Sequence, residues 1–296
     1  MSHGLVTTFK ALEHVPPRVA AGLGRGSGVV ASLFDSKSKR QLIANHQRLS
    51  DKLLDGAHIR EAFASYFEMF AQSPSLPGWS KARISRSVFV DDDLTQAVAQ
   101  EDGPIVSAMT HGGNWDLAAA FASFHLAPVV TVAEVLEPPE LFNYFVESRA
   151  AFGMKVFPAK RGVFEQLREY VRGKRVMVPL LADRDISGSG IEVDFGGHRA
   201  LVAAGPAALA SQLDAPLFAL HMSRLPGREA TYHLHARQVQ VTGDVPADTQ
   251  RWVDAIVPLI RSNLADWHMM QPLFVEDLDP ARLARARERA KREDTQ

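Results

Sequence analysis

From about residue 80 onward, short apolar runs alternate with segments of helical periodicity, and this alternation restricts the fold more than any other feature. It is typical of a sheet of mostly parallel strands with helices on both faces. We therefore expect an α/β fold with a central, mostly parallel (mixed) sheet, whose last two strands form an antiparallel edge. The expected strands are 104–109, 128–133, 154–158, 175–181, 191–195, 216–222 and 231–241, and the expected helices are 115–125, 138–152, 162–173, 202–213 and 247–267.

The N-terminal part of the chain is predicted to consist of several short helices. Residues 1–34 mix apolar residues with glycine and proline, which predicts short amphipathic helices broken at Pro16-Pro17. We interpret the glycine-rich run 22–28 as a flexible turn. Residues 39–72 have a helical pattern that Gly56 separates into two helices. Because there is no internal repeat or low-complexity linker, we expect one domain spanning 1–296, with 280–296 as a charged tail.

Composition excludes several classes of protein. Cysteine is absent, so there can be no disulfide, no thiolate metal site and no cysteine acyl-enzyme. No apolar run approaches the roughly 18 residues that span a bilayer, and no signal-peptide pattern is visible. Basic residues are not interleaved with aromatic ones and the body of the chain is net acidic, so we expect no nucleic-acid partner.

The overall net charge of −1 conceals a basic N-terminal region. Residues 1–60 hold nine Lys and Arg residues against four acidic residues. An anionic membrane surface attracts such a basic, partly apolar segment. We expect residues 1–34 to contact a membrane in this way, with a solvated helical face as the alternative.

The segment Thr110–Asp116, of sequence THGGNWD, is the strongest chemical signal in the chain. It places His111 on a glycine-containing turn between a buried strand and a helix, at the sheet edge where open α/β proteins bind ligands. A carboxylate that accepts a hydrogen bond from Nδ1 would make this imidazole a general base. Asp116 is close enough in sequence to contact the imidazole across the short turn, and Glu134 ends the next strand at the same edge of the sheet. Either acid is a candidate for this carboxylate. Backbone amides near Gly112-Gly113 are candidates for stabilising an oxyanion.

A second polar group follows the strand expected at 175–181. Asp183 and Asp185 flank Arg184, and such an acidic pair invites a metal site. However, no histidine or further acid lies nearby at ligand spacing, and Arg184 would oppose a cation. We therefore expect no metal, and assign the two acids to orienting Arg184 or a substrate hydroxyl. Basic residues around this edge are candidates for binding substrate phosphates, namely Arg149, Lys160, Arg161 and Arg184.

Five sequence blocks carry a resemblance to a known family. The histidine and the acid of the Thr110–Asp116 segment are separated by four residues, as in glycerolipid and lipid A acyltransferases. The wider set is similar to the actinobacterial phosphatidylinositol mannoside acyltransferases, and the resemblance covers roughly residues 5 to 285. The blocks are 111–116 (HGGNWD), 133–138 (AEVLEP), 145–149 (FVESR), 182–185 (ADRD) and 266–272 (DWHMMQP). One departure is Met269-Met270, where Met-Leu is expected; the change conserves volume.

The resemblance implies a glycerolipid-acyltransferase-like fold and an enzymatic activity. The activity is transfer of a fatty acyl group, typically palmitoyl, from acyl-CoA to a mannose hydroxyl of phosphatidylinositol mannoside. Acyl-CoA is a co-substrate and no cofactor is implied. The enzyme would be peripheral, at the cytoplasmic face of the plasma membrane. By position, His111 would be the base, Glu134 the acid that completes its relay, and Asp116 a residue that fixes the motif through Arg149.

Direct transfer in a ternary complex is the mechanism we expect, because no cysteine can carry the acyl group. Three alternatives stay open. A late lipid A-type acyltransferase is expected to have an N-terminal anchor. A metal-dependent glycosyltransferase would use Asp183 and Asp185. A non-enzymatic lipid-binding protein would contact the membrane through residues 1–34.

Overall fold

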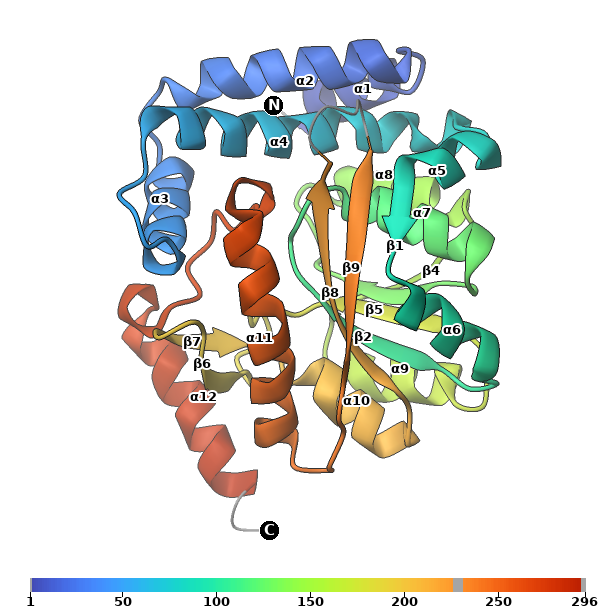
Figure 1. The fold of residues 1–296 in the computed structure, drawn as a ribbon, viewed down its shortest axis with the longest axis vertical. Coiled ribbons are helices and arrows are strands. Elements are labelled where there is room, and N and C mark those ends of the chain that lie inside the picture. The colour runs from blue at the N-terminus through green and yellow to red at the C-terminus, as the bar shows by residue number, and fades with distance from the viewer. Residues whose placement is uncertain (1, 226–230, 294–296) are drawn as a thin grey trace.

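The central sheet of the computed structural model, which describes residues 2–225 and 231–293, is mixed and mostly parallel (Figure 1). Strand β2 is parallel to both of its neighbours, β5 and β8, while β8 and β9 are antiparallel and β1 is parallel to β9. The strand order is β1(Val88–Val90), β9(Tyr232–Val239), β8(Leu217–Arg224), β2(Ile105–Met109) and β5(Met177–Leu181). The expected α/β class is confirmed. The expected antiparallel edge is wrong in one respect, since the short strand β1, absent from our prediction, covers β9.

Two small sheets flank the central one. Strands β3(Val130–Ala133) and β4(Lys155–Pro158) are parallel, and a bridge between Val129 and Met177 continues the sheet beyond β5. Strands β6(Ile191–Asp194) and β7(Arg199–Val202) form an antiparallel hairpin. Our prediction placed a helix from residue 202, but α10(Gly205–Leu213) begins three residues later, with Pro206 in its first turn.

Helices cover both faces of the central sheet. Along β2, Val106 and Ala108 join a core that includes Trp252 of α11(Val245–Ser262), whereas Ile105 and Met109 join a core on the opposite face. That second core contains apolar residues of α7(Trp115–His125). Alternate side chains of a strand point to opposite faces, so the central sheet is buried on both sides. The other helices in the body of the molecule are α5(Lys81–Ser87), α6(Asp92–Gln100), α8(Pro139–Ala150), α9(Val163–Val171) and α12(Pro280–Glu293).

Helix α11 ends five residues before the predicted end at residue 267. Asn263 leaves the helical conformation, and a 3-10 turn, η2(Leu264–Asp266), follows. This break lets Trp267 pair with Gly112 in an isolated antiparallel bridge. The C-terminal segment is thereby joined to the turn that carries His111.

Four helices form the N-terminal part, and one of them corrects our prediction. They are α1(Ser2–Leu12), α2(Pro17–Ser32), α3(Lys37–Leu49) and α4(Gly56–Gln72), with a 3-10 turn, η1(Ser73–Gly78), after α4. The breaks at Pro16-Pro17 and before Gly56 are confirmed, but the glycine-rich run lies inside α2. A side chain at Gly24 or Gly28 would collide with the backbone of α4, on which α2 lies (Figure 1). These glycines permit close helix packing and do not form a turn.

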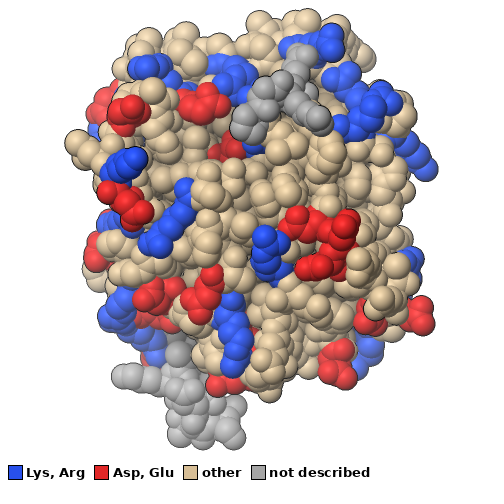
Figure 2. All heavy atoms as spheres, in the orientation of Figure 1, with Lys and Arg blue, Asp and Glu red and all other residues tan. Residues whose placement is uncertain are grey.

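The outer side of α2 is apolar. Its exposed apolar residues and those just after it are Val19, Leu23, Val29, Val30, Leu33 and Phe34. Figure 2 shows Lys and Arg side chains gathered at the same end of the molecule, toward α5, whose basic residues are Lys81, Arg83 and Arg86. Within the described ranges, no helix has both the length and the apolar character that crossing a bilayer requires.

Candidate active site

His111 sits on a turn that is fixed on both sides. It follows β2, and Asn114 caps α7 by accepting a hydrogen bond from the amide of Leu117 at 3.0 Å. The amide of His111 donates to Oδ2 of Asp183 at 2.9 Å, and its carbonyl accepts from the amide of His268 at 2.8 Å. The backbone that presents this imidazole is therefore held by two segments distant in sequence.

A buried carboxylate accompanies the imidazole. Nδ1 of His111 lies 2.6 Å from Oδ1 of Asp183, and Nε1 of Trp267 donates to Oδ2 at 2.8 Å. The His111 side chain is 24 % exposed and that of Asp183 is 0 % exposed. Burial alone would raise the pKa of Asp183, but the neighbouring imidazole and these hydrogen bonds outweigh burial and lower the pKa. An ionised Asp183 fixes the Nδ1–H tautomer and leaves the lone pair of Nε2 available.

The identity of this carboxylate corrects our prediction that Glu134 or Asp116 would accept the bond from Nδ1. Oε2 of Glu134 pairs with Arg184 at 2.9 Å, and Oδ1 of Asp116 pairs with Arg149 at 2.9 Å. The expectation that Asp116 engages Arg149 is thus confirmed. Asp116 belongs to the first turn of α7 and points to α8, while Glu134 follows β3, which lies beyond β5.

The register of β2 and β5 explains why Asp183 is the partner. Met109 pairs with Leu181 in parallel register, so the residues two positions further along each strand lie side by side. Those residues are His111 and Asp183. The sequence showed both strand ends but not that these two strands are neighbours.

An apolar cavity of about 250 Å³ lies beside the imidazole. His111 lines it together with both ion pairs, Glu134–Arg184 and Asp116–Arg149. Most of the remaining wall is hydrophobic, contributed by Met69, Phe70, Met109, Trp115, Ala119, Leu136, Phe142, Phe145, Met154, Leu181 and Ile186. Within the described part of the chain, Nε2 of His111 has no hydrogen-bond partner. The site can accept a proton next to a space suited to an apolar group.

The remaining predicted binding residues lie outside this cavity. Asp185 is buried and accepts hydrogen bonds from Ser187 and from the amide of Gly188, so it shapes its own turn. Lys160 and Arg161 are exposed after β4 and do not line the cavity. The structure therefore brings together His111, Asp116, Glu134, Arg149, Asp183 and Arg184, and leaves the other three apart.

The two glycines after His111 have different roles. The amide of Gly113 already donates to the carbonyl of Asp266 at 2.9 Å, so it is not free for the oxyanion role that we had considered. Gly113 has a φ of 53°, and a Cβ there would lie 2.7 Å from the carbonyl oxygen of Met222. A Cβ on Gly112 would lie 2.7 Å from the ring of His221. Both positions need glycine, and only the Gly112 amide remains a candidate oxyanion donor.

Trp267 is a site residue whose role sequence reasoning missed. Its indole is stacked between His46 at 5.7 Å and Phe195 at 5.8 Å, measured between ring centroids. Nε2 of His46 also contacts the Trp267 carbonyl at 2.7 Å. The indole is fully buried, which fixes its N–H toward Asp183. The block 266–272 in the sequence marked this segment as important without indicating this contact.

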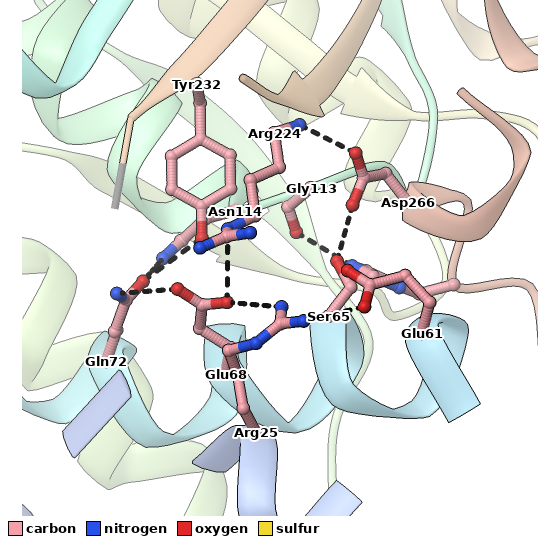
Figure 3. A network of polar contacts seen from close by, with 11 residues as sticks. Arg25, Glu61, Ser65, Glu68, Gln72, Gly113, Asn114, Arg224, Tyr232 and Asp266 are labelled. Atoms are coloured by element: carbon pink, nitrogen blue, oxygen red, sulfur yellow. Dashed lines mark hydrogen bonds and ion pairs between the residues drawn. The ribbon is translucent and has the colours of Figure 1, made fainter. Parts of the chain in front are cut away.

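A buried polar network lies behind the turn (Figure 3). Glu68, 1 % exposed, pairs with Arg25 at 3.0 Å and with Arg224 at 3.3 Å. Oε1 of Gln72 accepts hydrogen bonds from Asn114 and from the hydroxyl of Tyr232, each at 3.2 Å. Asp266 accepts from the hydroxyl of Ser65 at 2.6 Å and from the amide of Arg224 at 2.7 Å. This network ties α2 and α4 to the turn at Asn114.

Comparisons with known proteins show which family the chain resembles. The family model of the bacterial lipid A biosynthesis acyltransferases matches residues 4–276. The chain is 35 % identical over 287 residues to a phosphatidylinositol mannoside acyltransferase of Mycolicibacterium smegmatis, covering 95 % of this chain and 94 % of that protein. It is 34 % identical over 233 residues to one of Mycobacterium tuberculosis, covering 77 % and 73 %.

Proposed function

Because the chain belongs to the bacterial lipid A biosynthesis acyltransferase family, and is an acyltransferase, we propose that it transfers a palmitoyl group from acyl-CoA to a mannose hydroxyl of a phosphatidylinositol mannoside. The observation that carries the proposal is the pairing of buried Asp183 with His111, which lines an apolar cavity. The acceptor follows from the names of the two mycobacterial relatives.

In the proposed reaction, Nε2 of His111 removes the proton of the acceptor hydroxyl as its oxygen attacks the thioester carbonyl. The new C–O ester bond forms, the C–S bond breaks, and coenzyme A leaves as a thiolate, to which the imidazolium or solvent returns the proton. Asp183 stabilises the imidazolium through Nδ1–H during this step. No acyl-enzyme is needed, and the chain has no cysteine to form one.

The cavity walls support roles for the other charged residues. We assign the hydrophobic wall to the acyl chain, and the Glu134–Arg184 and Asp116–Arg149 pairs to orienting polar groups of the two substrates. Lys160 and Arg161 are exposed after β4, where they can contact phosphates of a larger substrate outside the cavity. Arginine and lysine bind phosphates through charge-assisted hydrogen bonds.

Membrane contact is part of the proposal. The apolar outer side of α2 and the basic residues of α5 lie at the same end of the molecule (Figures 1 and 2). Apolar insertion combined with basic residues is a common basis for peripheral binding to anionic lipid. We place this end of the enzyme on the cytoplasmic face of the plasma membrane, where acyl-CoA is accessible.

The test is incubation of the pure protein with palmitoyl-CoA and a mannosylated phosphatidylinositol in anionic vesicles, followed by mass analysis of the lipid. We expect one added palmitoyl group and release of coenzyme A. His111→Ala should lower the rate by about 10²–10⁴-fold, the range for loss of a general base. The matched control is His125→Ala, which changes an exposed histidine at the end of α7, the helix that follows His111. This variant should leave the rate unchanged.

Three outcomes would overturn parts of the proposal. Near-normal transfer by His111→Ala would exclude the general base. Transfer to a lipid A precursor but not to the mannoside would replace the acceptor. Lipid binding without release of coenzyme A would favour the non-enzymatic alternative.

A further inference from the structure

Three possible metal ligands meet at the opposite edge of the central sheet from β5. Asp91 follows β1, while His233 and His235 are two residues apart on β9, so their side chains leave the same face of the strand. One ligand atom from each residue lies within 4.8 Å of the others. Nε2 of His233 is 2.7 Å from Oδ1 of Asp91, and the two imidazole centroids are 3.9 Å apart.

We propose that Asp91, His233 and His235 bind one Zn²⁺ ion, with water completing the coordination. Two nitrogen and one oxygen ligand are a common set for zinc. Ligand atoms about 2 Å from a tetrahedral ion are roughly 3.3 Å apart. The separations here run from 2.7 Å to within 4.8 Å, so small side-chain rotations produce this geometry. All three residues are half-buried, which leaves the site open to solvent on one side.

The contacts around the three ligands already orient them. Oδ2 of Asp91 accepts hydrogen bonds from the amide of Ala236 at 3.0 Å and from Arg237 at 2.6 Å, which leaves Oδ1 to face the site. Nε2 of His235 lies 2.9 Å from the hydroxyl of Ser223; when it donates its proton there, Nδ1 carries the lone pair. Outer contacts of this kind fix the orientation of metal ligands.

Binding needs one proton rearrangement and no co-reactant. The ion inserts between Nε2 of His233 and Oδ1 of Asp91, and the proton on Nε2 moves to Nδ1 of the same ring. An imidazole coordinates the ion through the lone pair of a neutral ring nitrogen.

Charges near the site indicate a moderate affinity. The guanidinium of Arg237 lies on Asp91 and opposes a cation. Asp92 and Asp93, which follow Asp91 in the first turn of α6, act in the opposite direction. We expect a dissociation constant in the micromolar range, weaker than in a closed structural zinc site.

The position of the site assigns the ion to stability and not to acyl transfer. None of the three ligands lines the cavity beside His111. Asp91 and His233 are 142 residues apart in the chain. A bound ion would therefore cross-link the start of α6 to β9. A ligand that binds only the folded chain raises its melting temperature.

The experiment is calorimetric titration of the metal-free full chain with ZnCl₂ at pH 7.5, with Co²⁺ in parallel to report tetrahedral coordination by its visible absorption. We expect one ion per chain. His233→Gln and His235→Gln each remove a direct ligand, so each should weaken binding by more than about 100-fold, beyond the roughly 10–100-fold typical of losing an outer contact; circular dichroism checks that they fold. The control variants are His125→Gln, an exposed histidine elsewhere, and His58→Gln, which disrupts the His46–His58 contact of 2.9 Å; both should bind normally.

Zinc should also raise the melting temperature of the wild-type chain, and EDTA should reverse this rise without changing the initial rate of acyl transfer. Absence of binding by the wild-type chain, or binding that both ligand variants retain, would overturn the proposal. Loss of binding in His58→Gln but not in His233→Gln would place the ion elsewhere and would equally reject this site.

Discussion

Two buried aspartates flank the turn that carries His111, and their pKa values are shifted in opposite directions. Asp183, on the cavity side, has a lowered pKa because the His111 imidazole and the hydrogen bonds from His111 and Trp267 outweigh its burial. Asp266, on the other side, has a pKa raised to about 6 because burial outweighs the hydrogen bonds from Ser65 and Arg224. The same residue type, buried in both places, thus differs in pKa through its neighbours.

The difference divides the turn into a reactive part and a supporting part. On the Asp183 side, the imidazole borders a cavity and keeps one nitrogen without a partner among the described residues. On the Asp266 side, Gly113 and Asn114 hydrogen-bond to Asp266 and Gln72 within the network of Figure 3. We infer that substitutions on the first side change the rate of acyl transfer, and that those on the second change the free energy of unfolding.

The largest expected effect is that of Asp183→Asn on catalysis. An amide cannot stabilise the imidazolium and can reverse the tautomer, so we expect kcat/KM to fall by about 10²–10⁴-fold. Initial rates of Glu134→Gln and Asp116→Asn, measured beside it, should fall less, because these acids contact arginines and not the imidazole. A greater loss in Glu134→Gln than in Asp183→Asn would contradict our assignment and return the relay to Glu134.

On the supporting side, Glu68→Gln should chiefly destabilise the fold. Glu68 is buried between Arg25 and Arg224, and its loss leaves two partly buried guanidinium groups without their shared carboxylate. Breaking a fully buried ion pair costs about 3–5 kcal/mol; both arginines retain some exposure, so we expect about 2–4 kcal/mol in urea unfolding.

The matched control for Glu68 is Glu61→Gln, which removes the other partner of Arg25. Its side chain is 46 % exposed, so we expect a loss below about 1 kcal/mol. For both variants, kcat of the folded protein should stay close to the wild-type value. A stable Glu68→Gln protein with a greatly reduced kcat would contradict the division, because a residue of the supporting part would then determine the rate of acyl transfer.

The raised pKa of Asp266 predicts a specific dependence of stability on pH. Between pH 4 and pH 6 the native state holds a proton that the unfolded chain releases, so this group makes the free energy of unfolding fall as pH rises through that range. A pKa displaced from 3.8 to about 6 corresponds to about 3 kcal/mol at most.

Asp266→Asn removes this titration, so the difference between the two proteins isolates it from all other groups. Denaturant unfolding at several pH values should show the wild type losing about 1–3 kcal/mol relative to the variant between pH 4 and pH 6.5. A difference that does not change with pH, or that changes with the opposite sign, would reject the raised pKa.

The sequence was sufficient for the parts of this site that depend on local pattern. The strand before His111, the turn and the helix 115–125 were all predictable, because apolar runs, glycine and helical periodicity act over a few residues. The partner of His111 was not, since it depends on which strand lies beside β2 and in which register. Proximity in sequence favoured Asp116 as this partner, but α7 directs its side chain away from the imidazole and toward Arg149.

The glycines of α2 illustrate the same limit in the fold. As local signals, Gly24 and Gly28 indicate a turn. In the structure they lie in a helix, because the contact with the backbone of α4 compensates for their low helix propensity. Only knowledge of the packing partner distinguishes the two cases. Strand β1, of three residues, was too short to give a pattern of its own.

A small effect is expected for Thr110→Val, one residue before the imidazole. The Thr110 hydroxyl lies 2.8 Å from Nδ1 of His221, both residues are fully buried, and burial lowers the pKa of His221 to about 3. Valine has nearly the same shape but leaves Nδ1 without this partner, so thermal or urea unfolding should show a loss of about 1–2 kcal/mol. The rate of acyl transfer should change by less than about twofold, since Thr110 does not line the cavity. A large loss of rate would contradict this prediction. It would assign the neutral His221 ring to the reactive part of the turn, together with His111.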